Sequence, residues 1–555
     1  MAITNLIRFN NLRGDLFGGV TAAVVSLPLS LSFGVASGVG PLGGLYGAVC
    51  VGFFAALFGG TPTLISEPTG PMTVVMTTIV AGLTASNPEN GLAMAFTVVM
   101  LAGLFQIMFG IFKLGKYVTM MPYSVISGFM SGIGVILIIL QIAPFLGQAA
   151  PKGGVLGTFL KIPELIANGN PQEAILGALT LAIIFFMPKK ITKLVPPQLI
   201  ALIVGTVISL TVFGNADIRR IGEIPVGLPP LQLPTFSAGQ LTVMLVDGVM
   251  LGMLGCIDTL LTAVVADSLT RTEHNSNKEL MGQGIGNIVS GLCGGLPGAG
   301  ATMGTVVNIQ TGATSAVSGL TRALVLLVVV LGAAKLTQPI PMAVLAGIAL
   351  KVGIDILDWS FLKRSHKISA KGSLIMYGVL LLTVFVDLIV AVGIGVFIAN
   401  IITINQLSEM QSSKVKLISD FYDDDTSLSN EQKQLLDKGK GRVLLFCLSG
   451  PMIFGLSKAI SREHNAMKEA DALVMDLTEV PSMGVTASLA IENVIRDAHD
   501  KGLEVYVVGA SEKIQRRLQK LGLFDLIQPE HMISDRTTAL QQAVDRVNLQ
   551  RVTTE

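Results

Sequence analysis

The sequence predicts a polytopic α-helical membrane protein of about fourteen transmembrane segments, built as two inverted seven-helix repeats, and a small cytoplasmic α/β domain. Three observations predict this class: an apolar composition, similarity between the two halves, and an abrupt change after Gln406. Of 555 residues, 51% are hydrophobic and 14% are charged, whereas a soluble protein carries roughly 25% charged residues. The 61 glycines allow close packing between helices in a bilayer.

The predicted spans follow from the length of the apolar stretches, because a transmembrane helix needs about 20 apolar residues. The spans are expected near 15–36, 41–59, 92–112, 119–146, 173–188, 196–213, 241–266, 279–296, 316–334, 339–354, 371–386 and 388–405. Two further segments, 68–83 and 300–312, are too short or too broken to cross alone. The basic loops fall on one side if the N-terminus is cytoplasmic, and an even number of spans returns the C-terminus there. We expect a multi-pass protein of the plasma membrane.

Two pairs of segments indicate an internal repeat. GFFAALFGGTPTLISEPTGPMTVVM (52–76) resembles GNIVSGLCGGLPGAGATMGTVVNI (286–309), and PYSVISGFMSGIGVILI (122–138) resembles PMAVLAGIALKVGIDIL (341–357). Seven spans per half give the copies opposite topology, so that their broken helices meet at the bilayer midplane. The alternative is a loose match between glycine-rich sequences. The repeat predicts a transport domain over 1–406, with repeats at about 13–214 and 240–406.

The stretches SEPTGPM and LPGAGATM interrupt the helical pattern, because Pro68, Pro71 and Pro297 lack a backbone donor. A new helix start follows each break, and its first N–H groups have no intrahelical partner and lie at the positive end of the helix dipole. Two such starts facing each other hold an anion, and Thr69 and Thr302 add hydroxyls. Neither stretch contains Arg or Lys, which favours a small, weakly held oxyanion. The alternative is a pair of kinks that serve packing.

Asp258 is an acid inside an apolar span, where an unpaired carboxylate costs a few kcal/mol. Thr262 lies one turn later on the same face, and with the unwound carbonyls near Gly300 it completes an all-oxygen set that suits a hard cation such as sodium. Sodium would cancel the repulsion between Asp258 and a nearby anion. The alternatives are a structural pair with a basic residue and a proton-coupling acid.

After a linker over 407–438, the segment 439–550 alternates strands and helices, which is typical of a small α/β domain. Strands are expected at 441–450, 471–484 and 503–510, and helices at 451–467, 485–502 and 513–524. The segment has neither a phosphate loop nor a nucleophile elbow, so we expect no enzyme. A nucleic-acid partner is not expected either. A role in dimerisation or regulation is expected.

The motifs SEPTGPMTVVM, GCIDTLLTAVVADSLTRTEHNSNKEL and PGAGATMGTVVNIQ resemble those of the sulfate permease (SulP) family of anion transporters. The tail, with VLLFCLSGPMIFG and DLTEVPSMGVTAS, resembles the STAS domain, and the similarity is closest to the sodium-dependent bicarbonate transporters of cyanobacteria. The resemblance implies core and gate domains, an elevator-like movement, and a homodimer formed partly through the STAS domain. In related bacterial proteins a phosphorylated serine follows the second strand; Val485 stands there.

The resemblance also implies the site residues. It assigns sodium, a co-transported ion, to Asp258, Thr262, Gly300 and Thr302. It assigns bicarbonate to Thr69, Gly70, Ala301 and Thr302.

The expected function is sodium-dependent bicarbonate uptake by a secondary active transporter. The alternatives are a sodium- or proton-coupled carrier of sulfate or a dicarboxylate, and an anion channel or STAS signalling scaffold. Asp258 favours a carrier over a channel, because a channel does not require a buried acid that binds a cation or a proton.

Overall fold

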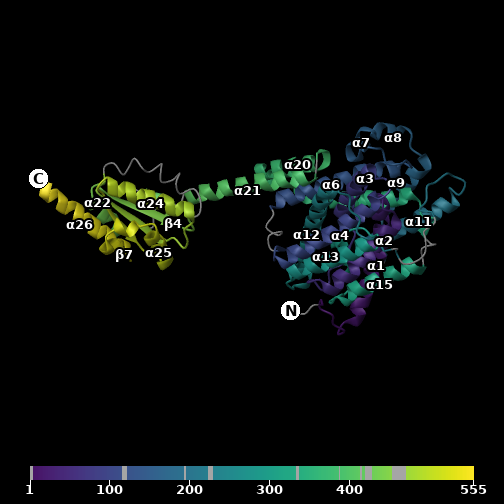
Figure 1. The fold of residues 1–555 in the computed structure, drawn as a ribbon, viewed down its shortest axis with the longest axis horizontal. Helices are drawn as coiled ribbons and strands as arrows, with labels where there is room; N and C mark the ends of the chain where they lie inside the picture. The colour runs from purple at the N-terminus through teal and green to yellow at the C-terminus, as the bar shows by residue number, and fades with distance from the viewer. Residues whose placement is uncertain are drawn as a thin grey trace. The chain divides into compact units, whose positions relative to one another are not determined.

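A computed structural model describes residues 4–115, 122–192, 195–222, 229, 231–332, 337–386, 388–412, 415–418, 428–452 and 470–554. The chain separates into two compact units, Met1–Phe397 and Ile398–Glu555 (Figure 1). The helix expected at 451–467 lies almost wholly outside the described residues.

A helix lies at each of the fourteen predicted segments, seven in each half; all belong to the first unit except the part of the last helix that continues beyond Phe397. The first half holds α1 (Leu12–Ala36), α2 (Pro41–Phe58), α3 (Gly70–Ser86), α4 (Gly91–Ile111), α6 (Tyr123–Phe145), α9 (Pro171–Phe186) and α11 (Pro197–Thr211). The second half holds α12 (Leu241–Thr270), α13 (Ser276–Leu292), α14 (Thr302–Gln310), α15 (Val317–Gly332), α17 (Met342–Ile356), α20 (Ala370–Phe385) and α21 (Leu388–Ser412). Among the described residues, six helices are long and apolar enough to cross a membrane.

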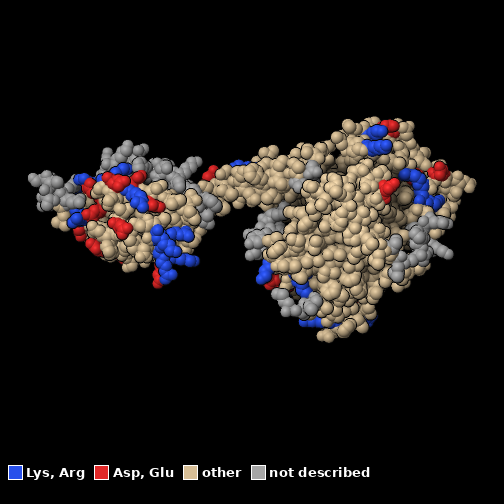
Figure 2. Space-filling view, in the orientation of Figure 1, with Lys and Arg blue, Asp and Glu red and all other residues tan. Residues whose placement is uncertain are grey.

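Short helices occupy the connections: α7 (Gly154–Leu160), α8 (Ile162–Ala167), α10 (Lys189–Thr192), α18 (Trp359–Leu362) and α19 (Ser365–Ile368). Proline residues and a capping side chain determine where several of the long helices begin. Proline occupies the first turn of α2, α9 and α11, where no intrahelical donor is lost. Asn170 caps α9 by accepting from the Gln172 amide. Figure 2 shows that most of the visible surface of this unit is uncharged, as lipid contact requires.

The helices of this unit form two packing groups, which agree with the expected core and gate. In the core group α13 packs on α4 and α2, α12 on α4, and α15 on α1 and α2; in the gate group α6 and α9 pack on α17, α20 and α11. The groups meet where α1 and α3 contact α17, α6 and α11. The two broken helices, α3 and α14, both contact core helices.

The second unit is a five-stranded sheet between two helical layers. Its strands are β3 (Val415–Ile418), β4 (Val443–Ser449), β5 (Ala472–Glu479), β6 (Glu504–Val508) and β7 (Met532–Ile533), in that spatial order. The β3–β4 pair is antiparallel and the others are parallel. The helices are α22 (Asn430–Lys438), α24 (Val485–Asp500), α25 (Glu512–Lys520) and α26 (Arg536–Thr554), with 3-10 turns η2 (Leu523–Asp525) and η3 (Pro529–His531).

Alternate residues of the central strands point to opposite faces of the sheet and pack in two separate apolar cores. Leu473 and Met475 of β5 pack in a core shared with α24 and α25, whereas Ala472 and Val474 pack in one shared with α22 and α26. This two-faced burial is typical of parallel sheets. The predicted strands and the described predicted helices are present. The structure adds β3 and α22 within 407–438, the stretch expected as a linker, and α21 continues to Ser412.

Candidate functional site

Two short strands join the breaks of the two repeats. β1 (Ser66–Glu67) pairs antiparallel with β2 (Ala299–Gly300), and Ser66 lies opposite Gly300. The paired residues are 234 positions apart, close to the lag between the two similar sequence segments. An antiparallel pair is the arrangement expected of inverted copies that meet at their symmetry axis. The pairing of β1 with β2 therefore brings together the starts of α3 and α14, which follow these strands.

Further hydrogen bonds tie each break to the other repeat. The Ala301 amide donates to the Ile65 carbonyl at 2.8 Å, and the Ile65 amide donates to Thr305 Oγ1 at 3.0 Å. A Cβ atom built on Gly300 would lie 3.1 Å from Thr259 Cα and 3.2 Å from Thr262 Cβ. Glycine at 300 thus allows β2 to pack directly against α12.

The first N–H groups of α3 and α14 have no side-chain cap in the described structure, although Pro71 in the first turn of α3 has no N–H. Both residues before the helices, Thr69 and Ala301, have extended backbones. A threonine at this position usually accepts a hydrogen bond from its own helix. The Thr69 hydroxyl instead donates to Asp258 Oδ2 at 2.7 Å. The helix-end donors are therefore free for an anion, and the hydroxyl is occupied by the acid.

Asp258 lies in the middle of α12 and is only 8% exposed. Its partner is a hydroxyl from the other repeat rather than an arginine, which excludes the structural-pair alternative among the described residues. Thr69 is also 8% exposed. A charged carboxylate this deep requires a compensating group, and one neutral hydroxyl gives partial compensation.

A second cluster of oxygens lies one turn along α12. The Thr262 hydroxyl donates to the Gly300 carbonyl at 2.9 Å and lies 2.8 Å from Thr302 Oγ1. Because Thr262 has one hydroxyl proton, Thr302 is the donor in the second bond. The Gly300 amide donates to Thr259 Oγ1 at 3.0 Å. The lone pairs of Thr302, which is exposed, remain available to a cation.

The structure brings together all seven residues that the resemblance implied for the site: Thr69, Gly70, Asp258, Thr262, Gly300, Ala301 and Thr302. The described residues contain no group of three or more His, Cys, Asp or Glu side chains that could hold a metal ion. One carboxylate among neutral oxygens fits a monovalent hard cation better than a divalent or transition metal. The donor set therefore fits a monovalent hard cation such as sodium.

Arg322 on α15 is a buried basic residue that the sequence reasoning missed. It pairs with Glu67 Oε2 at 2.5 Å, and both side chains are almost completely buried. Its guanidinium also donates to Ser26 Oγ, the Ala48 carbonyl and the Ser66 carbonyl. Arg322 thus fastens β1 to α1 and α2. The signal was present in the sequence, since Arg322 is the only charged residue in the span 316–334.

Amide side chains of α13 support both strands. Gln283 donates to Ser66 Oγ at 2.5 Å and to Glu279 Oε1 at 3.0 Å. Asn287 accepts from the Gly298 amide at 2.8 Å and donates to the Gly298 carbonyl at 3.0 Å. A polar stripe in the sequence of 279–296 was visible, but nothing in it identified the partners.

The gate group touches the tips of both broken helices. A Cβ atom on Gly70 would collide with Ile356 Cδ1 and would lie 3.6 Å from Val352 Cγ1, both on α17. Gln198 Nε2 at the start of α11 lies 3.9 Å from Met303 Sδ. An apolar side chain from the gate therefore covers the α3 tip in this conformation.

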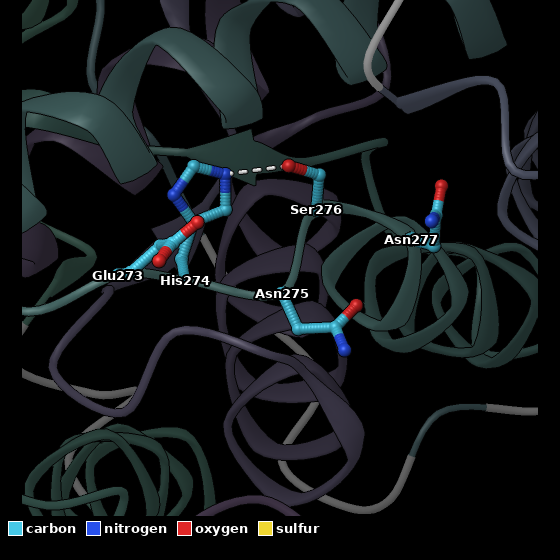
Figure 3. Close-up of a pocket in the computed structure, with 5 residues that line it drawn as sticks. All are labelled: Glu273, His274, Asn275, Ser276 and Asn277. Atoms are coloured by element: carbon cyan, nitrogen blue, oxygen red, sulfur yellow. Dashed lines mark hydrogen bonds between the residues drawn. The ribbon is translucent and has the colours of Figure 1, made fainter.

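A separate cavity of about 420 Å³ lies at the turn between α12 and α13, lined by Glu273, His274, Asn275, Ser276 and Asn277 (Figure 3). His274 Nδ1 lies 2.6 Å from Asp267 Oδ2, and its Nε2 lies 2.8 Å from Ser276 Oγ. These bonds join the end of α12 to the start of α13. Asp267 is about 13 Å along α12 from Asp258, so this turn is distinct from the oxygen cluster.

Comparisons with known proteins agree with the two units. The model of the sulfate permease family matches residues 12–379, and that of the STAS domain matches residues 434–539. A protein named bicarbonate transporter BicA from Synechocystis sp. is 67% identical over 544 residues, covering 98% of this chain and 96% of that protein.

The chain is also similar to solved structures of related transporters. The structure of the transmembrane domain of a cyanobacterium bicarbonate transporter BicA is 70% identical and covers 70% of this chain and 100% of that chain, with a TM-score of 0.67. The overall structure of SLC26A9 is 17% identical, covers 98% of this chain and 91% of that chain, and has a TM-score of 0.82. At that identity it supports the fold alone.

Proposed function

The chain belongs to the sulfate permease family, and from this we propose that it is a secondary active transporter that takes up bicarbonate together with sodium. The observation that carries the proposal is the hydrogen bond between Thr69 and Asp258, which connects the two ends of the site. The two relatives described as bicarbonate transporters, at 67% and 70% identity, support the choice of anion.

Bicarbonate would bind between the two helix starts, at Thr69, Gly70, Ala301 and Thr302. The first amides of α3 and α14 offer donors with a partial positive charge and no full charge. Arg322 lies behind β1, but Glu67 neutralises it. A site that lacks a free cationic side chain favours a singly charged anion over sulfate, whose second charge has no counterpart.

Sodium would bind at Asp258, Thr262, Gly300 and Thr302. These residues supply one carboxylate, one backbone carbonyl and two hydroxyl oxygens, which is the chemistry that a hard cation prefers. Thr302 belongs to both sets, so its single hydroxyl lies between the cation and the anion. The shared residue places the two substrates next to each other.

The hydrogen bond between Thr69 and Asp258 suggests how the substrates are coupled. Without sodium the Thr69 proton is held by the carboxylate, and the anion loses one donor. Asp258 would also repel an anion at about 5 Å by about 3 kcal/mol at an effective dielectric near 20. Sodium on Asp258 removes the repulsion and releases the hydroxyl. The anion therefore binds well only after the cation.

Coupling to sodium also supplies free energy for bicarbonate uptake. Bringing one negative charge into a cell that is negative inside costs about 2.3 kcal/mol per 100 mV. One co-transported sodium ion removes this cost, and any sodium gradient adds to the uptake. The stoichiometry that follows is at least one sodium per bicarbonate.

Alternating access would occur by an elevator-like movement of the core group against the gate group. The contact surface between α1 and α3 on one side and α17, α6 and α11 on the other is where the groups would slide. The cover of Ile356 over Gly70 would be released when the core moves. We place the protein in the plasma membrane as a homodimer joined partly by its STAS domain, with both termini in the cytoplasm.

Uptake into liposomes tests this function. Purified protein should accumulate labelled bicarbonate when a sodium gradient is imposed, and should do so weakly with potassium or with a proton gradient alone. Sulfate uptake without bicarbonate uptake would defeat the proposed anion. Bicarbonate uptake that ignores sodium would defeat the proposed coupling.

A further inference from the structure

The STAS unit carries a line of four basic side chains along α25. Lys513, Arg516, Arg517 and Lys520 are all exposed, whereas Ile514 and Leu518 on the opposite face are buried in the domain core. Spacings of three and four residues place the four basic side chains on one helix face. Figure 2 shows a concentrated blue patch where Figure 1 labels α25.

Exposed aliphatic side chains flank this basic face. Val485 is 71% exposed and Leu489 is 49% exposed, both on the first turns of α24. Arg517 donates to the carbonyl of Met483, just before α24, and α24 and α25 are in contact. The basic and aliphatic side chains therefore belong to one surface, which we call the α24–α25 face.

The charges on this face are largely uncompensated among the described residues. Arg516 pairs with Glu512 at 3.2 Å, but both side chains are highly exposed, and such a pair contributes little. The helix thus presents four positive charges and one negative charge. A surface of this kind attracts a dense negative partner.

The composition of the face favours lipid over protein. Protein interfaces are depleted in lysine and enriched in aromatic residues and arginine. This face has two lysines as well as two arginines, and the side chains beside them are aliphatic and not aromatic. Anionic headgroups attract Lys and Arg, while Val and Leu enter the boundary of the acyl chains. The STAS unit is covalently continuous with the membrane unit, so the local concentration of lipid is high.

We infer that the α24–α25 face is a docking surface for the anionic cytoplasmic leaflet. Docking holds the STAS unit against the bilayer through several weak charge contacts and two small aliphatic insertions. The attraction is screened within about 10 Å at 0.1 M salt, so the contact responds to ionic strength and to the content of anionic lipid.

Photo-crosslinking of the full chain tests this inference. The protein is placed in nanodiscs of phosphatidylcholine and phosphatidylglycerol that contain a photoactivatable phosphatidylglycerol. Crosslinks to peptides within 485–524 are expected, and a photoactivatable phosphatidylcholine should give far fewer. The triple variant K513Q/R516Q/K520Q should lose them, since each basic side chain contributes about fivefold to binding.

Two further variants separate the contribution of this face from that of the overall charge of the unit. The variant K438Q/K440Q/K501Q removes three exposed lysines elsewhere on the unit and should crosslink like the native chain. V485S/L489S should weaken crosslinking while the charge is unchanged. Equal crosslinking to both lipids, no crosslinking, or crosslinks from this face to a second copy or to an acidic protein would overturn the inference. Sodium-driven uptake by the same variants, reconstituted in liposomes, confirms that the chain is folded, and its failure would concern the transport site instead.

Discussion

Oγ1 of Thr69 lies 2.7 Å from Oδ2 of Asp258, although the two residues are 189 positions apart in the sequence. The bond joins the residue before the first broken helix to the acid in the second repeat. Through this bond, occupancy of the proposed cation site at Asp258 changes whether the Thr69 hydroxyl is free to bind the anion.

Replacing Asp258 by asparagine should abolish sodium-stimulated uptake. The amide keeps the shape and can still accept from Thr69, but it lacks the charge that holds the cation. Loss of about 3 kcal/mol of attraction corresponds to about a 100-fold weaker sodium affinity. Asp267→Asn, which removes an acid at the far end of α12, is the control. Sodium dependence that survives in Asp258→Asn would remove Asp258 from the cation site.

Replacing Thr69 by valine should move the two affinities in opposite directions. The anion loses a hydroxyl donor, so the KM for bicarbonate should rise. Sodium no longer has to displace a hydrogen bond to a charged group, so sodium affinity measured without bicarbonate should increase about tenfold. Thr69→Ser keeps the donor and should resemble the native protein. A fall in both affinities in Thr69→Val would contradict the proposed coupling.

Breaking the Glu67–Arg322 pair should destabilise the membrane unit. Arg322→Met leaves a buried carboxylate without its partner, which costs about 3–5 kcal/mol in the free energy of unfolding. The double variant Arg322→Met/Glu67→Gln should recover part of that loss, because no unpaired charge remains. Thermal unfolding of the two variants and of Glu67→Gln completes a double-mutant cycle. Additive effects would show that the pair contributes no coupling energy.

Adding a methyl group at Gly70 should slow transport through a collision with Ile356. Overpacking of this kind costs about 1–3 kcal/mol in the conformation in which Ile356 covers Gly70. That conformation is then less populated, and uptake, which passes through it in every cycle, should fall about tenfold. Gly70→Ala/Ile356→Ala should restore most of the rate, since the shorter side chain makes room. Ile356→Ala alone controls for the loss of the cover. A double variant as slow as Gly70→Ala would place the defect in anion binding instead of the gate.

Much of the fold could be predicted from local sequence. Each of the fourteen segments contains a helix in the structure, because the bilayer demands a minimum apolar length and proline marks helix starts and breaks. The central strands of the STAS unit were equally clear. The antiparallel edge strand β3 and helix α22 were not predicted, because both are short and lie in a largely polar stretch; β3 pairs with β4, and α22 packs on the sheet and begins with a capping box of Ser429 and Gln432.

The sequence by itself determined the membrane class, the two broken helices and the unusual acid, since each is a local departure from an apolar pattern. Only the tertiary structure decided that β1 pairs with β2, that Arg322 neutralises Glu67, and that Asp258 bonds to Thr69. The physical reason is that a buried polar group must find a partner, and in a helical bundle that partner can come from any helix. Partners hundreds of residues apart leave no local signal of their pairing.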